Sequence, residues 1–207
     1  MNPKPTLSFL ASHGGSAAKA IIHAIKNHQL SANIGVVITN NENSAISQWC
    51  LENTIKIIHI SALTHPNSDQ EDKAIEDALS VAETDYVILS GYMKHIKQQT
   101  LARFSNKILN VHPALLPKHG GQGMYGNRVH QAVLNAKETI SGASIHFINE
   151  VYDDGPVIAQ QEVPVYPNDT VDTLRQRVQA IEPLLYIKSI AKILEAHPND
   201  LGVTCPN

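Results

Sequence analysis

The stretch Lys107-Ile-Leu-Asn-Val-His-Pro-Ala-Leu-Leu-Pro-Lys118 begins with a short apolar run that is typical of a buried strand. Within it, Asn110 and His112 are two residues apart, so an extended chain projects both side chains from one face. Pro113 then ends the strand, because its ring removes a backbone donor and restricts the preceding residue. The stretch therefore predicts a carboxamide and an imidazole side by side where open α/β sheets bind ligands. A strand end with two satisfied polar residues fits the same pattern.

Upstream of this stretch, apolar runs alternate with helical patterns. Strands are expected at residues 6–11, 33–39, 54–60 and 85–91, with helices at 17–27, around Trp49 and at 70–82. Strands separated by helices at this spacing are typical of parallel βαβ units with right-handed crossovers. We therefore expect an α/β fold, Rossmann-like, with a mostly parallel twisted sheet and helices on both faces.

Downstream, the pattern predicts a helix at 129–135, two alternating strands at 143–148 and 156–165, and a long helical segment from residue 169. Asp169 or Thr170 is expected to cap that segment, and Pro183 to kink it or split it into two helices. The sequence shows neither repeats nor long linkers, so we expect a single domain over residues 1–207, loosely ordered from about residue 197.

Bulk composition excludes several classes of protein. A hydrophobic fraction of 43% and a charged fraction of 17% are ordinary for a globular protein, and a formal charge of −3 argues against a nucleic-acid or anionic-membrane surface. No apolar run approaches the ~20 residues that cross a bilayer, and residues 1–5 lack the long apolar region typical of a secretory signal, so we expect none. Cys50 and Cys205 are read as reduced thiols of a cytoplasmic protein, and the 11 histidines form no metal-binding pattern.

A glycine-rich corner, Ser12-His-Gly-Gly-Ser16, lies between the first strand and the first helix. Its glycines allow a tight turn, Ser16 is a candidate N-cap, and a helix start attracts anions such as phosphate. Many α/β proteins have such a turn that binds nothing, and neither Gly-x-Gly-x-x-Gly nor a Walker A motif is present. In a parallel sheet, however, the strand ends after Ala11, Ser90 and Val111 would share one crevice, which favours a binding role.

Four segments of the chain together resemble the folate-dependent formyltransferases: residues 110–118, 120–126, 144–147 and 152–158. The Asn-x-His-Pro-x-Leu-Leu-Pro string is specific to that superfamily. The Gly-Gly-x-Gly-Met-Tyr-Gly loop is similar to the branch that formylates glycinamide ribonucleotide in purine biosynthesis. The resemblance implies the formyltransferase fold and transfer of a formyl group from 10-formyltetrahydrofolate, a co-substrate, to an amine; no metal is expected.

Formyl transfer requires proton transfer from the amine, stabilisation of an oxyanion and protonation of the leaving nitrogen. His112 is the natural proton carrier, since imidazole titrates near neutral pH, and Asn110 can donate an amide N–H to the oxyanion. A nearby aspartate would orient the imidazole. Asp153, rather than Asp154, matches the family's essential carboxylate, although two aspartates before Gly155 otherwise suggest a simple turn.

The resemblance also implies binding residues. The substrate phosphate would be held by backbone donors of the corner made of Gly14, Gly15, Ser16 and Ala17. Glu182 would bind the ribose hydroxyls, with Gln179 one turn before it, although a solvated surface glutamate fits the same position. The folate pocket would be lined, largely through backbone groups, by Leu89, Tyr92, Met93, Lys94, His95 and Ile96; ordinary packing is the alternative for Met93.

Departures from the family pattern keep other functions open. Ala17 stands where relatives have asparagine, His13 is new, and Lys94 replaces an arginine. A formyltransferase for another amine such as an amino-sugar nucleotide, a formyltetrahydrofolate hydrolase, and a non-catalytic folate- or nucleotide-binding protein are the alternatives. The expected partners are small molecules, with no nucleic acid or membrane, for a monomer or a homodimer. The loop 120–126 is expected to be poorly ordered without ligand.

Overall fold

The computed structural model describes residues 3–195, so the predicted loose tail and Cys205 lie outside the described residues. The chain divides into two compact units, Met1–Asn110 and Val111–Asn207, and each is described by itself. The predicted single domain stays a prediction. The boundary falls within strand β5 (Ile108–His112), whose last two residues belong to the second unit.

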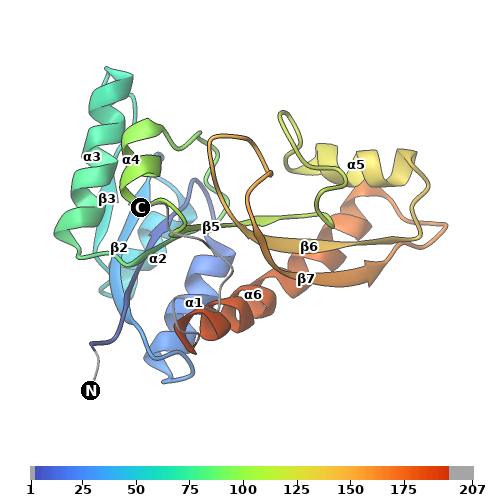
Figure 1. The fold of residues 1–207 in the computed structure, drawn as a ribbon, viewed down its shortest axis with the longest axis horizontal. Helices are drawn as coiled ribbons and strands as arrows, with labels where there is room; N and C mark the ends of the chain where they lie inside the picture. Colours follow the sequence, from blue (N-terminus) through green and yellow to red (C-terminus); the bar gives the residue numbers. More distant parts are fainter. Residues whose placement is uncertain (1–2, 196–207) are drawn as a thin grey trace, which may run out of the picture. The chain divides into compact units, whose positions relative to one another are not determined.

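The first unit is a parallel sheet with helices between its strands (Figure 1). Neighbouring strands follow the order β3-β2-β1-β4-β5, and each of these pairs is parallel. The strands are β1 (Thr6–Leu10), β2 (Asn33–Thr39), β3 (Ile57–His59), β4 (Tyr86–Leu89) and β5; the helices are α1 (Ser16–Lys26), α2 (Ala45–Glu52), α3 (Ser68–Val81) and α4 (Gln98–Arg103). The predicted α/β class with a mostly parallel sheet is therefore confirmed.

The apolar pattern explains why these segments become the core of the first unit. Phe9 and Leu10 of β1 point to opposite faces of the sheet and both are fully buried, so both faces are covered. Strands β2 and β4 pair with the two edges of β1. Helix α1 has buried residues at helical spacing, including Ala18, Ile21 and Ile25, which form its inner face.

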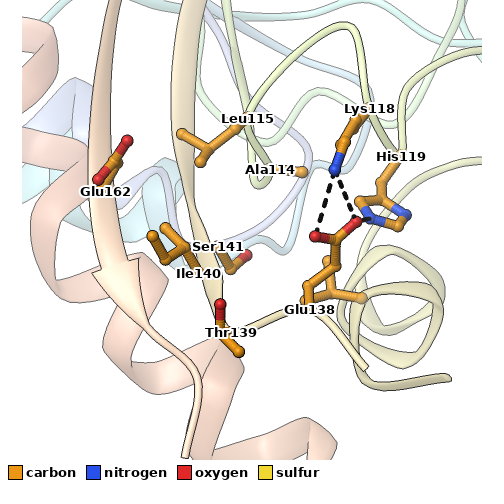
Figure 2. Close-up of a pocket in the computed structure, with 10 residues that line it drawn as sticks. Ala114, Leu115, Lys118, His119, Glu138, Thr139, Ile140, Ser141 and Glu162 are labelled. Carbon is orange, nitrogen blue, oxygen red and sulfur yellow. Dashed lines mark hydrogen bonds and ion pairs between the residues drawn. The ribbon is translucent and has the colours of Figure 1, made fainter. Parts of the chain in front are cut away.

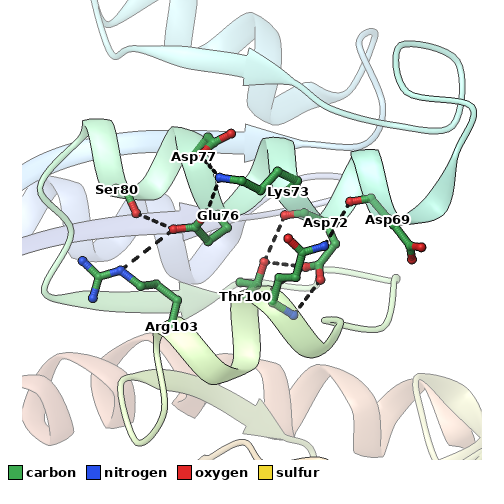
Figure 3. Close-up of polar contacts among 9 residues, drawn as sticks. Asp69, Asp72, Lys73, Glu76, Asp77, Ser80, Thr100 and Arg103 are labelled. Carbon is green, nitrogen blue, oxygen red and sulfur yellow. Dashed lines mark hydrogen bonds and ion pairs between the residues drawn. The ribbon is translucent and has the colours of Figure 1, made fainter.

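Helix α4 was not expected, because its six residues show too little apolar pattern. Its N-cap residue, Lys97, provides no side-chain cap. The buried carboxylate of Asp72 on α3 instead accepts hydrogen bonds from the backbone N–H of Gln99 (2.8 Å) and from the Thr100 hydroxyl (2.6 Å). Figure 3 shows Asp72 against Thr100. A side chain from another helix therefore satisfies two of the free N–H groups of this helix start, those of Gln99 and Thr100.

The second unit contains an antiparallel pair of strands and two helices. Strand β6 (Ile140–Phe147) follows β5 in the seven-stranded order, β7 (Val157–Pro164) forms the end of that order, and α5 (Asn127–Asn135) and α6 (Val171–Glu195) complete the unit. Helix α6 packs against β6, β7 and α5. The Thr170 hydroxyl accepts from the Thr173 N–H (3.2 Å), so Thr170 caps α6, as one of the two predicted alternatives.

Four details of the prediction were wrong. Strand β3 spans only Ile57–His59 and is half-buried rather than buried on both faces, because it forms the edge of the strand order. Gly15, not Ser16, is the N-cap of α1, in a left-handed conformation that a glycine adopts readily. Strand β6 is buried from Ser141 to Phe147 instead of alternating, because α6 packs on it and the segment after β5 binds Ser144.

The fourth detail concerns Pro183, which was expected to kink or split the last helix. It lies inside a single 25-residue helix, α6. Buried residues before and after the proline, Val178, Leu185 and Tyr186, pack on the same unit. We infer that this packing outweighs the one hydrogen bond that proline removes, so the predicted split is wrong, and the alternative, a kink at Pro183, stays a prediction. Within residues 3–195, no helix has both the length and the hydropathy to cross a membrane.

Candidate active site

Strand β5 presents the two polar side chains that its sequence predicted. Ile108 and Leu109 are buried and hold the strand in the sheet. Asn110 and His112, two residues apart, are half-buried and fully buried, respectively. Their side chains share a face because they are two residues apart on one strand. Asn110 is the last residue of the first unit, and His112 belongs to the second.

Asp153 lies against His112. Its Oδ2 atom is 3.3 Å from Nδ1 of His112, and the two side chains are only 11% and 3% exposed. Asp153 comes from the loop between β6 and β7 and has a positive φ of 56°, a conformation that an aspartate tolerates better than most residues. The same Oδ2 atom accepts from the backbone N–H of Gly121 (3.0 Å). Asp154, the neighbouring candidate, is exposed.

The hydrogen bonds of His112 determine which ring nitrogen carries a proton. Nε2 is 2.8 Å from the backbone oxygen of His119, and a carbonyl oxygen can only accept, so Nε2 must donate. A neutral His112 therefore directs the Nδ1 lone pair at the Asp153 carboxylate. That contact is attractive only when a further proton lies between the two groups. His112 and Asp153 thus form a pair that takes up one proton together.

A second histidine, His146 on β6, faces the other oxygen of the same carboxylate. Its Nδ1 donates to the backbone oxygen of Phe147 (3.0 Å), and its Nε2 is 3.6 Å from Oδ1 of Asp153. The sequence analysis quoted the motif Ser144–Phe147 but assigned His146 no role. The contact forms because the β6–β7 loop brings Asp153 against the ring of His146, and the position of that loop is not visible in the sequence.

Ser144, on the same motif, supports the turn that follows His112. Its hydroxyl donates to the Ala114 oxygen (2.6 Å) and accepts from the Leu116 N–H (3.0 Å). The Gln160 side chain on β7 donates to both the Ser144 hydroxyl (2.8 Å) and the Leu116 oxygen (2.9 Å). These contacts tie the segment after β5 to the antiparallel strands, so they help to position His112.

Burial and charge act in opposite directions on the histidines of the site. Burial lowers the pKa of His112, while the Asp153 carboxylate and the His119 carbonyl raise it, and the net direction is downward. The same balance, with burial first, lowers the pKa of His146. Burial, assisted by the positive Arg175 and by His112, lowers the pKa of His130 on α5 to about 4. Two of these histidines, His112 and His146, face the Asp153 carboxylate, and burial lowers the pKa of all three.

The predicted phosphate corner lies in the first unit, at the start of α1. Gly15 has φ of 59°, and a Cβ atom there would be 2.8 Å from Cδ1 of Ile46, so any larger residue at this position would be strained. Among the described residues, no acceptor contacts the backbone N–H of Ser16 or Ala17, as expected for the first turn of a helix. The geometry therefore offers free donors, which is what an anion requires.

The predicted folate-binding residues also belong to the first unit, where they follow β4. Leu89 ends that strand, and the N–H of Met93 donates to the Ser12 hydroxyl (2.8 Å), which joins this segment to the end of β1. Burial raises the pKa of Tyr92, and the side chain of Met93 is 53% exposed. Exposed Lys94 and His95 and buried Ile96 complete the set.

The predicted ribose-binding residues lie on consecutive turns of α6, in the second unit. Gln179 is exposed, and Glu182 is half-buried. Burial raises the pKa of Glu182 to about 7. A surface glutamate would keep its ordinary pKa, so Glu182 differs from the solvated alternative that its sequence position allowed.

Comparison with known proteins places these observations in a family. The sequence profile described as formyl transferase matches residues 6–190. The chain is 36% identical over 194 residues to the chloroplastic phosphoribosylglycinamide formyltransferase of Vigna unguiculata, covering 91% of this chain and 61% of that protein, less than two thirds of its length. It is 31% identical over 180 residues to the phosphoribosylglycinamide formyltransferase of Haemophilus influenzae, covering 87% of this chain and 82% of that protein.

Solved structures agree on the fold. The crystal structure of glycinamide ribonucleotide transformylase 1 from Symbiobacterium toebii matches with a TM-score of 0.87 and 28% identity, over 94% of this chain and 90% of that one. The match of the profile includes β5 and the loop that carries Asp153. On this evidence, the chain belongs to the formyl transferase family.

Proposed function

We propose that this protein transfers the formyl group of 10-formyltetrahydrofolate to the amine of glycinamide ribonucleotide, a step of de novo purine biosynthesis. The observation that carries the proposal is the contact between Asp153 and His112 (3.3 Å), on the strand that also presents Asn110. Family membership and the names of the relatives from Vigna unguiculata and Haemophilus influenzae support the choice of reaction.

The proposed chemistry assigns one task to each residue of the trio. The pair of His112 and Asp153 takes up the proton that the attacking amine loses and returns a proton to the leaving nitrogen of the folate. Asn110 donates its amide N–H to the oxyanion that forms when the amine adds to the formyl carbon. Burial of the pair keeps its proton affinity sensitive to charge, because few water molecules screen it.

The proposed binding roles follow the resemblance. Backbone N–H groups at Gly14–Ala17 would hold the phosphate of the acceptor, and Gln179 and Glu182 would bind its ribose. The segments at Leu89 and Tyr92–Ile96 would bind the folate. The unpaired donors of the α1 start and the raised pKa of Glu182 support these assignments. No metal is required, and we propose a cytoplasmic enzyme that is a monomer or a homodimer.

One observation favours a second candidate, a formyltransferase with another amine acceptor. Ala17, at the phosphate corner, lacks the side-chain amide that the resemblance implies at this position. An assay of folate-dependent formylation across a panel of phosphorylated amines, including an amino-sugar nucleotide, tests both candidates. We expect glycinamide ribonucleotide to be the best acceptor by at least about a hundredfold in kcat/KM, a ratio typical of sites built on polar contacts.

Three results would contradict the proposal. A higher kcat/KM for a different amine would show that glycinamide ribonucleotide is not the preferred acceptor. Release of formate at the same rate with and without acceptor would indicate a hydrolase. A protein that binds folate but transfers nothing, with wild-type His112, would indicate a binding protein. The control is His112→Ala, which should bind both substrates and lose at least about a hundredfold in turnover.

A further inference from the structure

The loop after β5 contacts both members of the catalytic pair through its backbone. The oxygen of His119 accepts from Nε2 of His112 (2.8 Å), and the N–H of Gly121 donates to Oδ2 of Asp153 (3.0 Å). A Cβ atom on Gly120 would be 3.2 Å from that of Asp153, so the loop passes close to the turn that carries the aspartate. The position of this loop therefore decides how the pair holds its proton.

A side chain outside the trio holds this loop. The Nε2 atom of His119 lies 3.3 Å from Oε1 of Glu138, and the same carboxylate contacts Nζ of Lys118 at 3.1 and 3.3 Å. Figure 2 shows the Glu138 carboxylate between the two side chains. Glu138 comes from the turn before β6, so it belongs to neither the loop nor the pair.

Two observations give the contact with His119 more weight than the contact with Lys118. The Lys118 side chain is 69% exposed, and an ion pair of that kind contributes little. The side chains of His119 and Glu138 are 17% and 27% exposed. His119 also has a positive φ of 56°, which costs free energy for a residue with a Cβ atom, so other contacts must hold it there.

We propose that Glu138 is a positioning residue for the catalytic pair: by holding the ring of His119, it keeps the backbone oxygen of His119 on Nε2 of His112. Its catalytic consequence rests on the proposed function, whereas its effect on His112 does not. A cavity of about 300 Å³ borders both Glu138 and His119 (Figure 2), so the ring has space to turn into once the carboxylate is removed.

The consequence for proton transfer follows from the donors and acceptors. While the His119 oxygen holds the proton of Nε2, the Nδ1 lone pair of a neutral His112 faces Asp153, and the pair gains by taking up a second proton. Without that oxygen, His112 can move its proton to Nδ1 and donate to Asp153 directly. The pair then needs no further proton. Loss of Glu138 should therefore lower the proton affinity of the pair.

Within residues 3–195, the titratable groups found to act on the pair lie in the second unit. His112 is influenced by Asp153 and by His119, and its own charge acts on His130 and His146. Glu138 has Lys118 and His119 as its partners, and the hydrogen bond from Lys118, followed by that from His119, lowers its pKa. It therefore stays ionised across the pH range in which the pair titrates.

The test compares Glu138→Ala with Glu138→Gln and with Lys118→Met. The alanine variant removes the acceptor of His119, the glutamine variant keeps an oxygen acceptor, and the methionine variant removes only the exposed partner. We expect Glu138→Ala to lose about tenfold in kcat, with the dissociation constants of both substrates unchanged within twofold. The pH profile of kcat should shift its acidic limb to lower pH. The other two variants should stay within threefold of the wild type in kcat.

A measurement on the free protein separates this inference from the proposed function. Long-range ¹H–¹⁵N NMR spectra, with His112→Asn for assignment, report which ring nitrogen of His112 carries a proton. We expect a protonated Nε2 in the wild type, in Glu138→Gln and in Lys118→Met, and a mixture of both tautomers in Glu138→Ala. If the wild type transferred no formyl group, the proposed function would fail and these spectra would still test the role of Glu138.

Three results would overturn the inference. One is an unchanged protonated Nε2 in Glu138→Ala. Another is an equal loss of kcat in Lys118→Met, which would indicate a general effect of the surface ion pair. The third comes from a double-mutant cycle of Glu138→Ala and His119→Ala. The two single variants and the double variant should lose the same factor in kcat, because all three break one contact. Additive losses would refute the inference.

Discussion

Replacement of Asp72 should reveal how a tertiary contact creates helix α4. Its carboxylate accepts from the N–H of Gln99 (2.8 Å), from the N–H of Thr100 (3.3 Å) and from the hydroxyl of Thr100 (2.6 Å). Gln99 is exposed, so water can replace the carboxylate at its N–H. Thr100 is 0% exposed, so its N–H would stay unpaired in Asp72→Ala. Its hydroxyl keeps one weaker acceptor, the Asp72 backbone oxygen at 3.3 Å.

The size of the effect can be worked from these contacts. One stranded N–H costs about 1–3 kcal/mol, and the loss of the short bond from the hydroxyl to the charged group costs about 1.5 kcal/mol. We therefore expect Asp72→Ala to lower the free energy of unfolding by about 3 kcal/mol, which corresponds to a fall in Tm of about 6–12 °C for a chain of this length. Asp72→Asn keeps one oxygen acceptor and should lose about half as much.

Urea unfolding followed by circular dichroism measures this difference, with Asp77→Ala as the matched control. Asp77 lies on the same helix, is 58% exposed and contacts only Lys73 in the described part of the chain, so its loss should change stability by less than about 0.5 kcal/mol. A fall below about 1 kcal/mol for Asp72→Ala, or an equal fall for Asp77→Ala, would refute the reasoning, since a buried stranded donor has no other source of relief.

Three further predictions concern the second unit. Asp153→Asn should lower kcat by about 10²–10⁴-fold while isothermal titration shows dissociation constants within threefold of the wild type, and a loss below tenfold would contradict a role in proton transfer. The pKa of Glu182 is raised to about 7, so the folded state holds this proton more tightly than the unfolded state does. The free energy of unfolding should therefore fall as pH rises from about 4.5 to 7. At pH 8, Glu182→Gln should be more stable than the wild type by up to about 3 kcal/mol, whereas at pH 4 it should not be. The pKa of His130 is lowered to about 4, so stability should fall as pH falls from about 6.5 to 4, and His130→Leu should flatten that limb of the unfolding curve; an unchanged slope would mean that His130 does not stay neutral.

Periodicity predicted most of the regular structure. Strand β2 was predicted at 33–39 and spans Asn33–Thr39, because its apolar run is long and both ends carry polar turns. Helix α1 was predicted from apolar residues at helical spacing, and strand β5 from a short apolar run that Pro113 ends. Strand β3 is shorter than its apolar run, since only three of those residues find a partner strand. An apolar run shows which residues can be buried, whereas hydrogen bonding to a neighbour decides where the strand ends.

The candidate site was predictable where the side chain itself carries the chemistry. Asn110 and His112 were predicted because their spacing places a carboxamide and an imidazole on one face at a strand end, and Asp153 was chosen from the resemblance to the formyltransferases. His146 and Glu138 gave no comparable signal. A histidine within a strand and a glutamate in a turn are ordinary, and only their partners make them part of the site.

By itself, then, the sequence determined the α/β class and the strand that carries Asn110 and His112, because both depend on the identity and spacing of near neighbours. The tertiary structure decided which ring nitrogen of His112 faces Asp153 and which carboxylate caps α4. Those contacts join residues that are 41 and 28 positions apart. Their geometry depends on strand register and loop path, which local periodicity does not encode.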